Sequence, residues 1–169
     1  MSEVGVVSVA ADAWVFGDLR LSAVPETHPF RVPCMTPEAY GWVLYRPYRR
    51  LRHCCWYHAV DWCEATTLAA DVLRRALAHL ATRESPRPAL GAVVDQHLPR
   101  GRSGHLKEAV EGLAWRHPII ASTEGITDGV HRLTAMRHQG VKTTPALVPA
   151  RPGQRLDEIP GAYPHQPRS

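Results

Sequence analysis

The feature that most restricts the fold of this chain is one long apolar stripe within residues 61–82. Its apolar side chains recur at the spacing of a single helix face and are Val72, Leu73, Ala76, Leu77 and Leu80. That spacing predicts an amphipathic helix, the strongest in the sequence. Asp61, with Glu64 three residues later, matches the spacing of a capping box and places the start of the helix there. Such a helix needs a second layer that covers its apolar face.

Short strand patterns elsewhere supply that layer. Stretches of apolar residues bounded by turn residues occur at 4–21, 90–94, 118–121, 126–127 and 143–148. Within the first of them, Gly17 and Asp18 are predicted to form a turn between two strands. The stretches at 118–121 and 126–127 are close enough to form a hairpin. The sequence therefore predicts an α+β fold, in which helices pack on a small mixed sheet.

Two shorter helices complete the expected elements. One should be capped by Ser103, turn Leu106, Val110 and Leu113 inward, and stop before Pro118. The other should run over residues 130–139 and end at a glycine, Gly140, the residue that most often ends helices in this way.

Composition favours one domain followed by a tail. The chain has 169 residues, of which 44% are apolar, enough for one core. Residues 1–148 are expected to form a single α+β domain, with an unplaced N-terminal part at 1–100. Residues 149–169 contain five prolines and are predicted to be an extended tail that folding does not require.

No apolar run reaches 18 residues and no secretory leader is visible, so the sequence predicts a cytoplasmic protein without a membrane partner.

Residues 128–135 concentrate groups suited to phosphate chemistry, at a point where a strand gives way to a helix. Gly129 allows a tight turn, and the backbone N–H groups of Val130 and its neighbours, at the positive end of the helix dipole, favour an anion. His131 and Arg132 add side-chain donors. Asp128 could hold magnesium or accept a proton from an attacking hydroxyl. The alternative is structural, with Asp128 a helix cap and Arg132 a solvated side chain.

The same segment resembles the core motif of the ParB/sulfiredoxin superfamily. The matching pattern is a strand, a hairpin, the sequence D-G-x-H-R-x-x-A at residues 128–135, a helix ended by Gly140 and a strand that opens near Pro145. The resemblance is strong over about 30 residues, and the helix before Pro118 extends it, so residues 101–148 are expected to be a ParB-like core.

The resemblance implies a nucleotide-binding protein with phosphotransferase or nucleotide-hydrolysing activity. By that analogy Asp128 and His131 belong to the catalytic site, and Gly129, Val130, His131 and Arg132 hold the phosphates. ATP, ADP or CTP would be the ligand, with a magnesium ion on Asp128. Relatives also include nucleases, so a DNA-binding protein or nuclease that uses the same pocket is an alternative. A non-catalytic scaffold for a protein partner is another.

This chain differs from the superfamily pattern in two respects, and each difference argues against one of the functions known in the superfamily. Sulfiredoxins carry a reactive cysteine just before the His-Arg pair, where this chain has Val130, so repair of sulfinic acids is not expected. Chromosome-partition proteins continue into a second phosphate motif and a helix-turn-helix domain. Here a proline-rich segment follows residue 148, which argues against a role in partition.

A second cluster gathers residues that can bind metal. It comprises His53, Cys54, Cys55, His58 and Cys63. Structural zinc commonly uses paired C-x-x-C or H-x-x-x-H spacings, and the cluster has neither. Burial of cysteines beside Trp56 and Trp62 is the alternative to a zinc site.

Basic and aromatic residues alternate just before that cluster. The arginines are Arg46, Arg49, Arg50 and Arg52, and the aromatic residues are Tyr45, Tyr48, Trp56 and Tyr57. Alternation of this kind suits a nucleic-acid strand, through phosphate contacts and base stacking, and also suits a solvated face with buried rings. The net charge of +4 fits a phosphorylated partner but does not require one.

Overall fold

The computed structural model describes residues 14–25, 55–81, 90–98, 100–101, 104–122, 125–151, 154 and 158–164. Its described elements, in chain order, are β1 (Trp14–Arg20), η1 (Leu21–Ala23), α2 (Trp56–Ala59), α3 (Trp62–Ala81), α4 (Leu90–His97), α5 (Gly104–Glu111), the π-helical turn η4 (Gly112–Arg116), β2 (Ile119–Ser122), β3 (Gly125–Asp128), α6 (Val130–His138) and β4 (Thr143–Pro149). The expected α+β fold with a small mixed sheet is confirmed.

The four strands form one sheet in the order β1-β4-β2-β3. β1 runs antiparallel to β4 and β3 antiparallel to β2, whereas β2 and β4 are parallel. Because Arg20 lies opposite Thr143 and Ile120 opposite Asp128, the last residues of β1 and β3 and the first residues of β2 and β4 point to one end of the sheet. Helix α6 starts at this end, directly after β3, and leads into β4.

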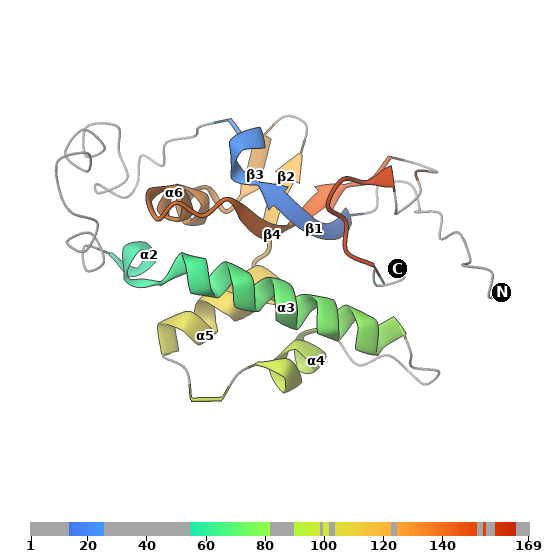
Figure 1. Ribbon diagram of the computed structural model, residues 1–169, viewed down its shortest axis with the longest axis horizontal. Coiled ribbons are helices and arrows are strands. Elements are labelled where there is room, and N and C mark those ends of the chain that lie inside the picture. Colours follow the sequence, from blue (N-terminus) through green and yellow to red (C-terminus); the bar gives the residue numbers. More distant parts are fainter. Residues whose placement is uncertain are drawn as a thin grey trace.

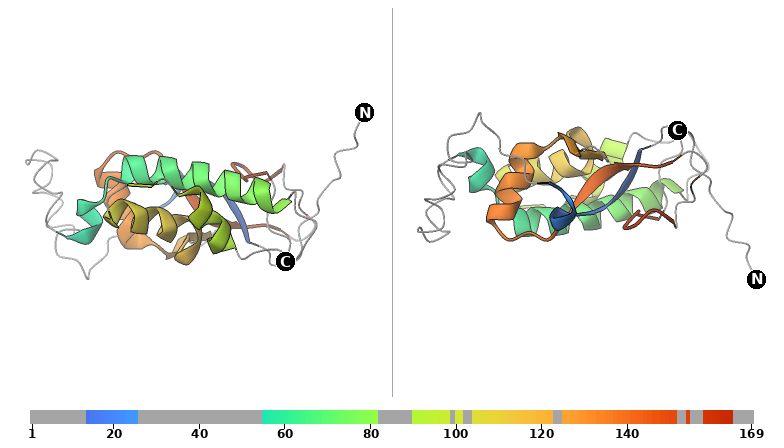
Figure 2. Two further views of the ribbon diagram at one scale, coloured as in Figure 1. Left: turned by 90° about the horizontal axis from the view of Figure 1, so that it is seen from below. Right: turned by 90° about the horizontal axis from the view of Figure 1, so that it is seen from above.

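Helices α3, α4 and α5 form a layer on one face of the sheet, and α6 lies beside the end of the sheet (Figure 1). Seen from below, α3 and α5 run side by side (Figure 2). The predicted stripe of α3 is buried from Val72 to Leu80. The Asp61 carboxylate accepts a hydrogen bond of 3.1 Å from the backbone N–H of Glu64, so the predicted cap is confirmed.

The shorter predicted helices also form. Leu106, Val110 and Leu113 are buried along α5 and the π-helical turn that continues it. Helix α6 ends with Gly140 in the left-handed conformation, at a φ of 73°, as the sequence predicted. Ser103, the expected cap of α5, lies outside the described residues.

Two local predictions were wrong. Residues 90–94 were expected to form a strand and instead begin helix α4, which buries Val93 and Val94 against α3 and the π-helical turn. Gly17 and Asp18 were expected to form a turn but lie within the single strand β1. Pairing with β4 over the whole of β1 keeps this segment extended, because every residue of β1 has a partner there.

The end of the chain returns to the sheet, although residues 149–169 were expected to bury little. Ile159 and Tyr163 are 7% and 2% exposed, and they pack in clusters with Val15 and Phe16 of β1. The backbone N–H of Asp18 donates to Gly161 and that of Tyr163 donates to Phe16. Residues 161–163 therefore cover the outer edge of β1, whose hydrogen-bonding groups would otherwise be unpaired.

None of the described helices combines the length and the hydropathy that crossing a membrane requires.

Candidate functional site

Asp128 and Gly129 form the corner between β3 and α6. Gly129 is the N-cap of α6 with a φ of 99°, a left-handed conformation that strongly favours glycine. A Cβ atom at this position would lie 2.8 Å from Cγ1 of Ile119, so the tight approach to β2 also requires glycine. The N-cap residue of α6 is therefore Gly129, which has no side chain to cap the helix, and not Asp128. The alternative in which Asp128 serves only as the helix cap is therefore wrong.

The Asp128 carboxylate is directed to the surface, with its side chain 55% exposed. It lies 3.7 Å from the guanidinium of Arg132, one helical turn further on. At that separation and exposure the ion pair contributes little to stability, about 0–1 kcal/mol. Asp128 is thus accessible to a ligand or a metal ion without the loss of a strong internal contact.

Arg132 is held more tightly than a solvated side chain. Its side chain is 11% exposed, and one guanidinium nitrogen donates to the backbone carbonyl of His117. Burial lowers the pKa of Arg132, and the nearby Asp128 carboxylate acts in the opposite direction. An arginine remains charged in such surroundings. Arg132 therefore fastens the start of β2 to α6 and places a positive charge beside Asp128.

His131 lies half-buried in the first turn of α6 and stacks on Tyr57 of α2. The two rings are nearly parallel, with centroids 5.2 Å apart and an interplanar angle of 15°. This contact links the predicted phosphate site to the second cluster of the sequence. A stacked ring has little rotational freedom, so Tyr57 fixes the orientation of the His131 imidazole.

The C-terminal end of α6 is joined to residues 55–62, the segment that contains Tyr57, by a series of polar side-chain contacts. His58 is buried and hydrogen-bonds to His138 at 2.9 Å, with the two rings nearly parallel at an interplanar angle of 4°. The other ring nitrogen of His58 lies 3.4 Å from Sγ of Cys55. Burial lowers the pKa of His58. The side-chain amide of Gln139 accepts a hydrogen bond from the backbone of Trp62 and donates one to that of Val60.

The predicted phosphate residues follow one another around one corner, whereas the described members of the metal cluster, Cys55, His58 and Cys63, do not form a site. Among the described residues, no group of three or more histidine, cysteine, aspartate or glutamate side chains is placed to hold a metal ion. Cys55 faces His58, and Cys63 lies 3.5 Å from the backbone oxygen of Gln139. His53 and Cys54 lie outside the described residues, as do all four arginines of the predicted nucleic-acid track, so the DNA-binding alternative stays a prediction.

Sequence reasoning missed the residues that support the site. Tyr57 was noted only as part of the aromatic alternation, and His138 and Gln139 were not singled out. No local signal marks these residues, because their partners lie far away in the sequence: His58 and His138 are 80 positions apart.

Comparison with protein-family models, with curated proteins and with solved structures gave no match.

Proposed function

We propose that the corner formed by Asp128, Gly129 and the first turn of α6 binds the phosphates of a nucleotide in a ParB/sulfiredoxin-like manner. The observation that carries the proposal is the left-handed backbone of Gly129, which starts α6 without a described side-chain cap, beside an exposed carboxylate. The N–H groups at the start of a helix and its dipole attract phosphate, and α6 has nine residues. ATP, ADP and CTP are the candidate ligands.

Each side chain of the corner has a separate proposed role. His131, oriented by Tyr57, donates a hydrogen bond to a phosphate oxygen, and Arg132 contributes positive charge from its anchored position. Asp128 accepts the proton of an attacking hydroxyl or water, because it is the exposed carboxylate of this corner.

Magnesium fits this corner only together with a nucleotide. Magnesium bound to nucleotides is commonly held by one or two carboxylates plus the phosphates, and Asp128 supplies one such carboxylate. The ion would neutralise charge on the phosphates. The proposed reaction, phosphoryl transfer or nucleotide hydrolysis, needs a compartment that supplies nucleotides, and we propose the cytoplasm.

The first experiment measures the melting temperature of the full chain with ATP, ADP or CTP, with and without magnesium. A ligand that binds only the folded state raises the melting temperature by an amount that grows with the logarithm of its concentration above the Kd. The nucleotide that stabilises most is then used to measure turnover. Absence of stabilisation by any nucleotide would contradict the proposal.

The Asp128→Asn variant then separates chemistry from structure. Turnover should fall by about 100-fold or more, since general-base contributions reach roughly 10²–10⁴, while the melting temperature stays near that of the wild type. Asp71→Asn is the matched control, because Asp71 also pairs with an arginine four residues on, Arg75, on an exposed helix surface. Full turnover in Asp128→Asn would show that this carboxylate is not the base.

A further inference from the structure

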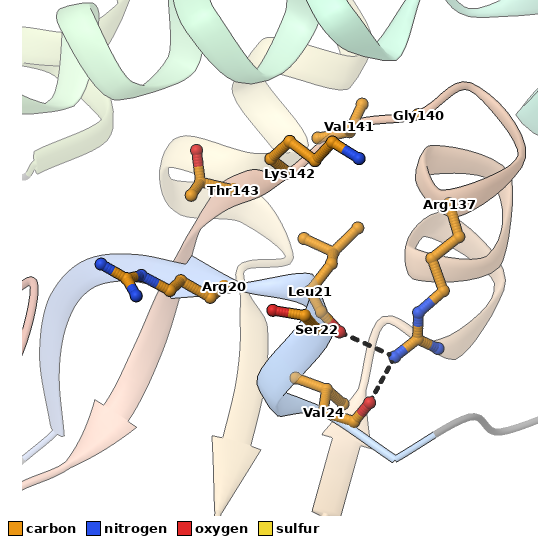
Figure 3. Close-up of a pocket in the computed structure, with 9 residues that line it drawn as sticks. All are labelled: Arg20, Leu21, Ser22, Val24, Arg137, Gly140, Val141, Lys142 and Thr143. Carbon is orange, nitrogen blue, oxygen red and sulfur yellow. Dashed lines mark hydrogen bonds between the residues drawn. The ribbon is translucent and has the colours of Figure 1, made fainter.

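A hollow lies at the C-terminal end of α6, away from Asp128 (Figure 3). It has a volume of about 440 Å³ and lies between the end of β1, the turn η1, the end of α6 and the start of β4. Sites for small molecules commonly measure roughly 300–1,000 Å³, so the hollow can hold a small ligand.

Among the residues that the structure describes, the hollow is lined by positive charge without a compensating acid. Arg20, Arg137 and Lys142 contribute three cations, Ser22 and Thr143 contribute two hydroxyls, and no aspartate or glutamate is among the lining residues that the structure describes. None of the ion pairs within the described part of the chain includes a cation of this hollow. Uncompensated cations around a concave surface raise the local concentration of anions.

One wall of the hollow is fixed by Arg137. Its guanidinium donates to the backbone carbonyls of Leu21 at 3.2 Å and Val24 at 2.7 Å, which fastens η1 to α6. Carbonyl groups carry no net charge, so the positive charge of Arg137 is not cancelled. In Figure 3 Arg137 and Arg20 lie on opposite sides of Leu21, with Lys142 between them, and the guanidinium of Arg20 points away from Arg137.

We propose that this hollow binds a small anion of the phosphate class with at least two negative charges, such as a pyrophosphate or a phosphate ester. Arginine matches the oxygens of phosphate with paired donors, lysine adds a point charge, and the two hydroxyls add neutral donors. The proposal does not rest on the nucleotide site. Two strands separate β1 from β3 in the sheet, which corresponds to roughly 15 Å, so one phosphate group cannot contact both places.

Inorganic pyrophosphate is the probe, and its affinity for the full chain is measured by calorimetry. The Arg20→Gln/Lys142→Gln double variant should bind it at least tenfold more weakly. Both replaced side chains are exposed, so the fold should be retained, which circular dichroism verifies. The matched control is Arg75→Gln/Lys107→Gln, which removes two exposed cations from other helices and should bind within about twofold of wild type.

Three results of the pyrophosphate experiment would overturn the proposal. They are no binding of pyrophosphate to the wild type, an equal loss in the control variant, and a loss in His131→Ala with full affinity in the Arg20→Gln/Lys142→Gln variant. The last result would place the probe at the start of α6 and support the nucleotide site instead. Citrate, a tricarboxylate, tests the chemical class: citrate binding tighter than pyrophosphate would overturn the phosphate assignment.

Discussion

Helix α3 covers one face of the sheet and α6 lies beside the end of the sheet, and different interactions hold the two helices in place. Along its whole length α3 buries an apolar stripe, in which Leu73 and Leu77 are completely inaccessible to solvent. In α6 only the middle is apolar, with Leu133 and Met136 in the core. Its two ends carry charged and polar groups that contact backbone carbonyls and other rings.

This difference places the residues that stabilise the fold in α3 and the candidate binding residues at the two ends of α6. Removal of an apolar side chain from α3 affects the folded state as a whole, because the stripe covers the sheet and the neighbouring helices. An exposed carboxylate lies at one end of α6, and cations that pair with no acid of the described residues lie at the other. Substitutions there should change binding more than folding.

The largest effect on stability is expected for Leu73→Ala. A buried leucine replaced by alanine leaves a cavity, and such changes cost about 2–5 kcal/mol of unfolding free energy. Urea unfolding measures the loss. Arg75→Ala, on the exposed side of the same helix, should change it by no more than about 0.5 kcal/mol. Similar losses for both variants would mean that the apolar stripe does not dominate the stability of α3.

The sequence predicted α3 and α6 because their signals are local. The stripe from Val72 to Leu80 has the period of a helix, and Gly140 marks the end of α6. The apolar run at 90–94 has no decisive period, and burial against α3 made it helical. A short apolar run suits either structure, so its sequence alone does not decide between them.

The candidate site could be predicted only in part, for the same reason. Asp128, Gly129 and His131 are close in sequence, and their motif is visible there. The contacts that orient them are not local: Tyr57 stacks on His131, and Arg132 reaches the carbonyl of His117. Asp18 was misread as a turn residue, whereas its carboxylate pairs with Arg74, 56 positions further on.

The second-largest loss of stability is expected when the segment that covers β1 is removed. A chain ending at Arg151 loses Ile159 and Tyr163, and burial of two such side chains contributes about 3 kcal/mol. It also loses the hydrogen bond of 2.5 Å from the Tyr163 hydroxyl to Asp18, a contact that together with burial raises the pKa of this tyrosine. The melting temperature should fall by several degrees.

A chain ending at Pro164 is the control for this truncation, because it keeps Ile159 and Tyr163 and should melt close to the full chain. If the shorter chain melted at the same temperature as this control, residues 158–164 would contribute nothing to the fold. The original expectation of a dispensable tail would then hold.

The smallest effect is a dependence of stability on pH that comes from His58. Burial lowers its pKa in the folded state below the ordinary value near 6.5, so the unfolded chain takes up a proton first as the pH falls. The contribution of neutral His58 is therefore complete above about pH 6.5 and is lost as the pH drops below that value. His138 and Cys55 face the same ring, and neither side chain is a carboxylate that would hold a proton on it.

Urea unfolding at pH 7.5 and pH 5.5 measures this contribution as the difference in unfolding free energy between the two conditions. His58→Gln should reduce that difference, because glutamine does not titrate and its amide can still hydrogen-bond to His138. His105→Gln is the control, since His105 is exposed on α5 and its replacement should leave the difference unchanged. An undiminished difference in His58→Gln would assign the acid sensitivity to another group. A reduced difference would show that the hydrogen bond between His58 of α2 and His138 of α6 stabilises the fold only while His58 is neutral. The apolar stripe of α3 contains no titratable group, so its contribution does not change with pH.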